Sequence, residues 1–288
     1  MKKILSKIIV AIIAISLLLG VVSCGGGNSE PVLKIIDIKL TDEQYAFVCK
    51  KGNTELVESM NSFMAEIKEN GTFETILAKY FEGKGEKVGY PITTSDVENT
   101  ADKFIVVTNC PFEPFEYMET DGKIYGIDIE IAAAYAKAHN LELVIRNIGF
   151  DEIFVQVEAG YADIGMAGIT VDADREKTYD FTTPYYQASQ KLIVPVGNTD
   201  FDNCKTAEDV EKVLASLQNA NVGYQSATTG SLYINGNESW GFDGFSNIKG
   251  KAYANAQVAV SDLIIGNIYA VILDEAPAEA IVKAANHQ

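Results

Sequence analysis

Strands and helices are predicted to alternate in two successive blocks of this chain, and this pattern constrains the fold more than any other feature. The first block has β-rich runs at residues 104–108, 141–146 and 162–164, separated by helical patterns at 128–140 and 151–158. The second block follows a strand at 191–195. Its further strands are expected at 222–224, near 252 and at 269–273. They alternate with helices at 207–215, from about 230, at 256–265 and at 275–285. Such alternation predicts largely parallel sheets covered by helices, so we expect an α/β fold with two lobes.

Two further helices are predicted ahead of these blocks. Residues 53–70 place a set of apolar side chains on one face at helical spacing, namely Leu56, Val57, Met60, Phe63, Met64 and Ile67. Asn53 can cap the start of this helix and Gly71 its end. A second helical pattern ends at Phe81, and residues 82–101, with three glycines and a proline, read as a linker.

The N-terminus is typical of a secretory signal. Lys2, Lys3 and Lys7 precede an uncharged apolar run at residues 8–22, which is shorter than a membrane-spanning helix requires. The sequence Val21-Val-Ser-Cys24 resembles a bacterial lipobox, so we expect a lipoprotein signal peptide at residues 1–23, acylation of Cys24 and a flexible tether at residues 24–30. An uncleaved signal anchor is the alternative.

Charge and cysteine usage exclude several classes of function. The chain has a net charge of −17, and removing residues 1–23 takes away three lysines and no acidic residue, which leaves 20 basic and 40 acidic residues, or −20. This acidity argues against nucleic acid and anionic lipid headgroups as partners. Cys49, Cys110 and Cys204 are widely spaced and show no disulfide framework or metal-ligand spacing, so we expect no metal site and no cofactor.

Arg175 is the first candidate for ligand binding. Its guanidinium is always charged and offers a planar fork of donors that fits a carboxylate. Gly168, where a ligand can approach the backbone closely, and the hydroxyl of Thr170 lie just upstream. This combination predicts a receptor for a small carboxylate, whereas a surface ion pair with Asp172 or Asp174 is the simpler alternative.

Other candidate residues follow the ends of predicted strands, where ligands of α/β folds bind. Asn109 and Phe112 follow the strand at 104–108, and Phe150 follows the strand at 141–146. The segment from Gln225 to Gly230, which includes Thr228 and Thr229, follows the strand at 222–224. Asp274 follows the strand at 269–273. The simpler interpretations are core packing for the aromatic rings and helix capping for the threonines and Asp274. An arginine for a carboxylate, an aspartate for an ammonium and aromatic rings for a side chain together match an α-amino acid.

The order of these residues resembles the family-3 solute-binding proteins, the polar amino-acid receptors of bacterial ABC importers. The matching segments are Pro114-Phe-Glu-Tyr117, Gly126-Ile-Asp-Ile-Glu130, Gly160-Tyr-Ala-Asp163, Ala167-Gly-Ile-Thr170 with Arg175, Asp180-Phe-Thr-Thr-Pro-Tyr-Tyr186, Gln225-Ser-Ala-Thr-Thr-Gly230 and Asp274. The resemblance implies a two-lobed periplasmic-binding-protein type II (Venus-flytrap) fold that binds a free amino acid. The predicted ligand-binding residues are Asn109, Phe112, Phe150, Ala167, Gly168, Thr170, Arg175, Gln225, Thr228, Thr229 and Asp274.

The resemblance also implies a role for each of these residues. Arg175 would bind the α-carboxylate, helped by Thr170 and by N–H groups around Thr229. Asp274 and the Gly168 carbonyl would bind the α-ammonium, and Phe112 and Phe150 would enclose the substrate. Asn109 occupies a position where many relatives carry an aspartate that reads the ligand side chain, which weakens the case for lysine or arginine. Glutamine, other neutral polar amino acids and an aromatic amino acid stay open as ligands.

The order of the segments departs from the family in one respect. Residues 34–81 resemble the C-terminal end of family members but precede everything else here. We therefore predict a circular permutation in which residues 82–101 join the ancestral termini. Lobe 1 would comprise residues 41–194 and lobe 2 residues 31–40 and 195–288, with the hinge near 38–41 and 194–196. A truncated gene fused to a fragment is the alternative.

The predicted function is that of a monomeric, lipid-anchored receptor on the outer side of the cell membrane, facing the periplasm or the exterior. It would capture a free amino acid and present it to an ABC transporter permease, without catalysing a reaction. Two alternatives remain open. A dehydratase on the same scaffold would need an acid inside the cleft, for which Glu113 and Glu116 are the nearby candidates, and a sensory receptor would need a signalling partner.

Overall fold

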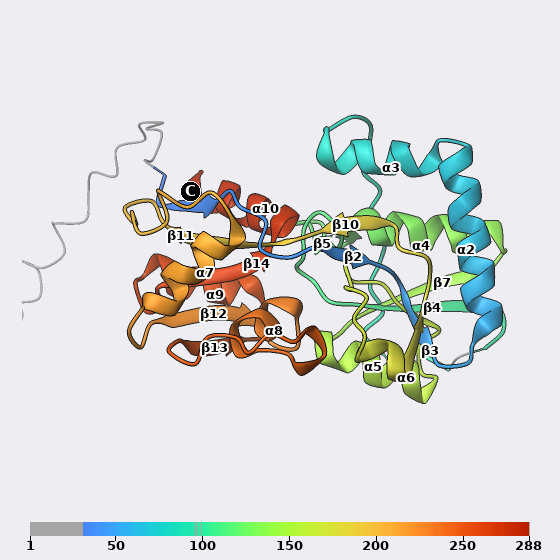
Figure 1. The fold of residues 1–288 in the computed structure, drawn as a ribbon. Helices are drawn as coiled ribbons and strands as arrows, with labels where there is room; N and C mark the ends of the chain where they lie inside the picture. Colours follow the sequence, from blue (N-terminus) through green and yellow to red (C-terminus); the bar gives the residue numbers. More distant parts are fainter. Residues whose placement is uncertain (1–30, 96, 99, 288) are drawn as a thin grey trace, which may run out of the picture.

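The computed structural model describes residues 31–95, 97–98 and 100–287, so the predicted signal peptide, Cys24 and tether lie outside the described residues. Two α/β lobes lie side by side and are joined by two strands, β2 and β10 (Figure 1). No helix within the described part of the chain is long and apolar enough to cross a membrane. The predicted fold class, a two-lobed α/β protein, is confirmed.

The first lobe is built on a five-stranded sheet. Its strand order is β7 (Glu142–Asn147), β4 (Lys103–Thr108), β8 (Ile164–Gly165), β3 (Val48–Lys50) and β9 (Tyr179–Phe181). The strand β4 pairs in parallel with β7 and β8, while β3 runs antiparallel to both of its neighbours. A short hairpin of β5 (Tyr117–Met118) and β6 (Ile124–Tyr125) is added to this lobe. Because β4, β7 and β8 run in the same direction, the residues that follow them meet at one edge of the sheet.

The helices of this lobe are α2 (Thr54–Glu69), α3 (Thr72–Phe81), α4 (Ile127–Ala138), α5 (Phe150–Ala159) and the short α6 (Arg175–Thr178). The predicted helix at 53–70 is confirmed, and Asn53 accepts a hydrogen bond from the Leu56 N–H at 3.4 Å. Gly71 adopts a left-handed conformation (φ 78°) between α2 and α3, a geometry that glycine adopts without steric penalty. The apolar face of α2 is buried in the core of the lobe, as its periodicity predicts.

The second lobe also contains a five-stranded sheet. Its order is β1 (Leu33–Ile36), β11 (Gln190–Pro195), β14 (Ala270–Asp274), β12 (Asn221–Gln225) and β13 (Lys249–Tyr253). Its helices are α7 (Ala207–Ser216), α8 (Thr229–Asn235), α9 (Ala256–Ile264) and α10 (Glu275–Asn286), with a 3₁₀ turn η1 (Glu238–Trp240). The parallel strands β12 and β14 end at Gln225 and Asp274, and both of these residues lie next to residues of the first lobe around one cavity.

The strand β1 attaches the start of the described chain to the second lobe. It pairs antiparallel with β11, with Leu33 opposite Pro195 and Ile36 opposite Leu192. The Asn286 amide at the end of α10 accepts from the Val32 and Leu33 N–H groups and donates to the Leu33 carbonyl, at 2.9–3.0 Å. The two ends of the described chain are therefore hydrogen-bonded to one another.

Of the two chain segments that cross between the lobes, the second does not lie where the sequence predicted it. The strands β2 (Glu43–Tyr45) and β10 (Tyr186–Ala188) pair antiparallel between the lobes. The predicted crossing at 194–196, and with it the lobe boundary at residue 194, is wrong, because β11 lies inside the second sheet between β1 and β14. The apolar run from residue 191 to 195 is a buried central strand, and the crossing lies just before it.

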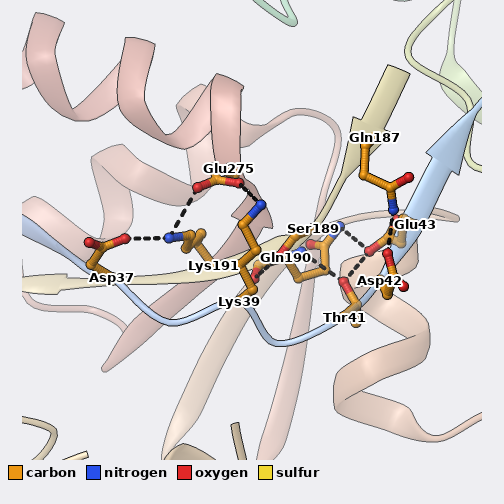
Figure 2. A network of polar contacts seen from close by, with 10 residues as sticks. All are labelled: Asp37, Lys39, Thr41, Asp42, Glu43, Gln187, Ser189, Gln190, Lys191 and Glu275. Atoms are coloured by element: carbon orange, nitrogen blue, oxygen red, sulfur yellow. Dashed lines mark hydrogen bonds and ion pairs between the residues drawn. The ribbon is translucent and has the colours of Figure 1, made fainter. Parts of the chain in front are cut away.

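Polar contacts fix the hinge strands to the second lobe (Figure 2). Lys191, whose side chain is only 4 % exposed, forms ion pairs with Asp37 at 2.5 Å and with Glu275, the first residue of α10, at 3.1 Å. The Glu43 carboxylate accepts from the hydroxyl of Thr41 at 2.5 Å and from the amide of Gln190 at 3.2 Å. These contacts link β2 with the beginning of β11 and α10.

The linker at residues 82–101 packs against the first lobe. Tyr90 exchanges two backbone hydrogen bonds of 2.9 Å with Ile124, and Lys87 donates to the Tyr117 hydroxyl at 2.7 Å. Nearby, the buried Glu130 of α4 accepts from Lys79 at 2.5 Å, from Tyr80 at 2.8 Å and from the Val88 N–H at 3.2 Å. Glu130 therefore joins α3 and the linker to the core of the lobe.

We expect Glu130→Gln to lower the free energy of unfolding by about 2 kcal/mol, because it breaks a buried ion pair and weakens the hydrogen bonds around it. Urea denaturation followed by circular dichroism measures this change. Glu82→Gln is the matched control, since Glu82 pairs with Lys84 on the exposed surface, where loss of an ion pair has little effect on stability. Equal effects of the two substitutions would contradict the proposed role of Glu130.

Candidate functional site

One cavity lies between the lobes and encloses about 320 Å³ of space, part of it open to solvent. All eleven residues predicted from the sequence line it, together with one more, Glu116; the full set is Asn109, Phe112, Glu116, Phe150, Ala167, Gly168, Thr170, Arg175, Gln225, Thr228, Thr229 and Asp274. The structure thus brings the predicted residues together, while their roles in binding stay predictions.

The first lobe contributes an aromatic wall. Phe112 lies in the loop after β4 and Phe150 begins α5, so both follow strands of the parallel part of the sheet. Gly168 lies against the Phe112 ring, and a Cβ on this residue would come within 2.6 Å of a ring carbon. With φ at 51°, Gly168 also has a left-handed conformation that favours glycine. Glycine is therefore needed here to let Phe112 and the backbone at residue 168 line the same cavity.

Arg175 is the cation of the cavity. Its guanidinium donates to the Thr170 carbonyl at 2.7 Å and to the Ala227 carbonyl of the other lobe at 3.0 Å, and it lies 5.6 Å from the centre of the Phe150 ring. Burial lowers its pKa, while the nearby charges of Asp172, Glu43 and Asp274 act in the opposite direction. An arginine remains charged in such a setting.

Arg175 does not form the surface ion pair with Asp172 or Asp174 that the sequence left open as the simpler alternative. Asp172 accepts hydrogen bonds from the backbone N–H groups of Asp174 and Arg175, at 2.9 and 3.3 Å, rather than from the guanidinium. Asp174 pairs with Lys177 at 2.5 Å. Asp172 therefore holds the first turn of α6, and the guanidinium is left facing the cavity.

Asp274 is the acid on the opposite side. It ends β14, and its carboxylate accepts from the Tyr45 hydroxyl at 2.6 Å and makes no capping bond to α10. Burial, and after it the charge of Glu43, raises the pKa of Asp274 from 3.8 to about 7. Helix capping, the simpler interpretation, does not apply, because the carboxylate points to the hinge strand β2 instead.

Thr170 already has a partner for its hydroxyl proton. It donates to Glu43 at 2.7 Å and accepts from the Thr229 hydroxyl at 3.1 Å. A hydroxyl carries a single proton, so Thr170 cannot donate to a ligand carboxylate while it donates to Glu43. Its predicted role at the carboxylate therefore requires a rearrangement of this chain of hydrogen bonds. Glu43 and Tyr45 were not predicted, because they lie on β2 rather than after one of the strand ends from which the site was inferred.

The lobes are closed over the cavity. Hydrogen bonds between side chains of one lobe and groups of the other are Arg175 to the Ala227 carbonyl, Thr229 to Thr170, Gln225 to Asn109 at 2.8 Å and Trp240 to Asp172 at 2.9 Å. Asn109 also donates to the Ile148 carbonyl at 2.6 Å. Thr228 donates to the Gln225 carbonyl and does not cap α8 with its side chain. Both lobes thus contribute polar groups to one enclosed site.

Glu116 is the lining residue that the sequence interpretation did not place in the cavity. It is only 1 % exposed, and among the residues that the structure describes neither carboxyl oxygen has a hydrogen-bond partner. Burial raises the pKa of Glu116 well above its ordinary value, and the charges of Asp128 and Asp274 add to this effect. Glu113, the other acid considered, is exposed and lines a separate surface hollow.

Known proteins match this chain in sequence and in structure. Residues 104–238 match the bacterial extracellular solute-binding proteins, family 3. A probable histidine-binding protein of Neisseria gonorrhoeae is 27% identical over 204 residues, which cover 70% of this chain and 68% of that protein. The ABC transporter arginine-binding protein 1 of Escherichia coli (strain K12) is 28% identical over 178 residues, 62% of this chain and 65% of that protein. The chain thus matches about two thirds of the length of these relatives.

A solved structure of an ancestral arginine-binding protein bound to arginine is also similar. It is 30% identical in sequence, with a TM-score of 0.55, and the match covers 65% of this chain and 76% of that one. The two lobes, the cavity between them and these similarities agree with one another. The chain belongs to the bacterial extracellular solute-binding proteins of family 3.

Proposed function

We propose that this chain is the receptor of an ABC importer, which captures a free α-amino acid between its lobes and presents it to a permease without transforming it. The observation that carries the proposal is the pair of opposite charges, Arg175 and Asp274, at one closed cavity between the lobes. Relatives named for binding histidine and arginine support an amino acid as the ligand. A zwitterion matches this pair, because its carboxylate and ammonium each meet a buried group of opposite charge.

The proposed binding mode follows from these positions. Arg175 binds the α-carboxylate, Asp274 and the Gly168 carbonyl bind the α-ammonium, and the rings of Phe112 and Phe150 enclose the ligand. For the ligand side chain we propose a neutral polar group, as in glutamine. The amides of Asn109 and Gln225, which pair at 2.8 Å, support this because they give that part of the cavity hydrogen-bonding groups without charge.

We also propose that the chain is a circular permutant of its family. The family match begins at residue 104, after β1, β3, α2 and α3. Those elements complete the two lobes: β1 is an edge strand of the second sheet, and β3 lies inside the first. Both contributions support a circular permutation. They argue against the alternative, in which the first residues are an unrelated fragment that packs elsewhere.

The proposed anchor is a lipid on Cys24 that holds the monomeric receptor on the outer face of the membrane. The support is the sequence of residues 1–24 together with membership of an extracellular family. Mass spectrometry of protein from the membrane fraction tests it. An N-terminus that still begins at Met1 would refute the cleavage.

A thermal-shift screen of the twenty amino acids, followed by titration calorimetry, tests the receptor function. We expect one or a few amino acids to stabilise the protein, since a ligand at 100 times its dissociation constant adds ~2.7 kcal/mol to the free energy of unfolding. The ligand recovered afterwards should be chemically unchanged. Conversion of a bound ligand would support the dehydratase alternative, and absence of any stabilisation would refute the receptor.

Trp240 should report closure, because it is the only tryptophan and its indole N–H donates across the cleft to Asp172. We expect saturating amino acid to change its fluorescence, and Trp240→Phe to lower the affinity about 3-fold to 10-fold by removing one hydrogen bond to a charged acceptor. Fluorescence titration and calorimetry measure the two effects. A Trp240 signal that does not respond to a ligand detected by calorimetry would contradict this role in closure.

A further inference from the structure

Glu116 is held rigidly at the wall of the cavity by its backbone. Its carbonyl accepts from the Phe112 N–H at 2.7 Å, which closes the loop that carries both residues. Behind it, Gly126 packs so closely that an added Cβ would lie 1.9 Å from the Phe115 carbonyl oxygen and 2.8 Å from the Glu116 Cα. The backbone of Glu116 is therefore fixed by the fold, and its side chain is buried at the wall of the cavity.

The surroundings of this carboxyl group favour its uncharged form. The other acids of this region are satisfied, since Asp128 accepts from the Gly168 N–H and the Tyr185 hydroxyl, and Asp274 accepts from Tyr45. Glu116 has no such donor within the described part of the chain, and the charges that act on it, from Asp128 and Asp274, are negative. Burial and these negative charges favour the protonated form of Glu116, which can donate a hydrogen bond.

We propose that Glu116, as a neutral carboxylic acid, recognises the side chain of the bound amino acid, and that this side chain ends in a primary carboxamide, as in glutamine or asparagine. The acid O–H donates to the amide oxygen and the amide N–H₂ donates to the acid carbonyl, so both polar atoms of Glu116 gain a partner without any charge. This inference rests on the proposed amino-acid receptor function and names its ligand class.

The location of Glu116 supports this role. It lines the same cavity as Asn109 and Gln225, the proposed amide pair, and as Asp274, the proposed ammonium site. A ligand whose side chain is apolar would leave both buried oxygens of Glu116 without a partner, which is costly.

Titration calorimetry at pH 7 with L-glutamine, L-methionine and L-lysine tests the proposal on the full chain and on the variants Glu116→Gln and Glu116→Leu. We expect the wild type to bind glutamine at least about tenfold more tightly than methionine or lysine. Glu116→Gln should keep glutamine affinity within about threefold, because an amide also offers one donor and one acceptor to the ligand. Glu116→Leu should lose about tenfold or more for glutamine and stay within about threefold for methionine.

Glu113→Gln is the matched control and should change no affinity, since Glu113 is exposed outside the cavity. Ligand-free melting temperatures verify that each variant folds. Equal losses for glutamine and methionine in Glu116→Leu would reduce Glu116 to a packing residue. Tighter binding of lysine that disappears in Glu116→Gln would make Glu116 a carboxylate that binds a cation. Either result overturns this inference and leaves the receptor intact, whereas a wild type that binds no amino acid refutes both.

Discussion

Arg175→Ala is expected to weaken amino-acid binding by about 100-fold to 1000-fold, the larger of the two effects expected from the charged pair of the cavity. In the closed cleft, the ligand carboxylate would lose its only cationic partner among the lining residues and remain buried. Truncating one partner of a buried, hydrogen-bonded charge pair costs about 2–5 kcal/mol. The same substitution removes the bond from Arg175 to the Ala227 carbonyl and so weakens closure. Titration calorimetry measures the loss.

Arg146→Ala is the matched control, because Arg146 is the other arginine of the chain and lies outside the cavity, with its guanidinium donating to Gln156 at 3.1 Å. We expect this variant to bind the ligand with wild-type affinity. Unchanged affinity in Arg175→Ala would reject the proposed carboxylate site, and an equal loss in both variants would point to general destabilisation.

Asp274→Asn is expected to weaken binding by about 30-fold to 300-fold and to remove a pH dependence. Because burial and Glu43 raise the pKa of Asp274 to about 7, only part of the wild-type protein carries the negative charge that an ammonium requires at neutral pH. Affinity of the wild type should therefore fall by up to about tenfold for each pH unit below about 7. Calorimetry between pH 5 and pH 8, an interval of about 3 units around this pKa, compares the two profiles.

In the ligand-free protein, a rise in pH should lower stability through Asp274, whereas in the ligand titration it should strengthen binding. Its pKa in the folded protein lies above the ordinary value of 3.8, so between these two values the unfolded chain binds fewer protons than the native one. The contribution of Asp274 to the free energy of unfolding is therefore lost as the pH rises through this window. The difference in melting temperature between wild type and Asp274→Asn should vary with pH accordingly. A wild-type binding profile as flat as that of the variant would contradict the assignment.

Sequence patterns predicted the elements well where periodicity was long. The helix at 53–70 has six apolar residues on one face, and the structure buries its central ones. The lobe boundary failed for a different reason. An apolar run such as residues 191–195 indicates a buried strand but not the sheet to which it belongs, and β11 pairs with β14, which lies some eighty residues further along the chain.

The cavity was predicted through residues that follow strands, and the residues that were missed occupy other positions. Glu43 and Tyr45 reach the site from the hinge strand β2, which is remote in sequence from Thr170 and Asp274. Glu116 was considered only as a possible catalytic acid, because sequence does not reveal that Gly126 fixes its backbone beside the cavity. Such contacts depend on chain crossings and close packing, which local patterns do not encode.

The hydrogen bonds between Asn286 and the start of β1 have a mechanical consequence. Any attachment made ahead of Val32, whether a surface, a tag or another chain segment, pulls on the second lobe alone. If the receptor opens by bending at β2 and β10, the first lobe would be the body that rotates relative to that fixed point. Arg175 therefore belongs to the lobe that would move, while Asp274 belongs to the lobe that carries the attachment.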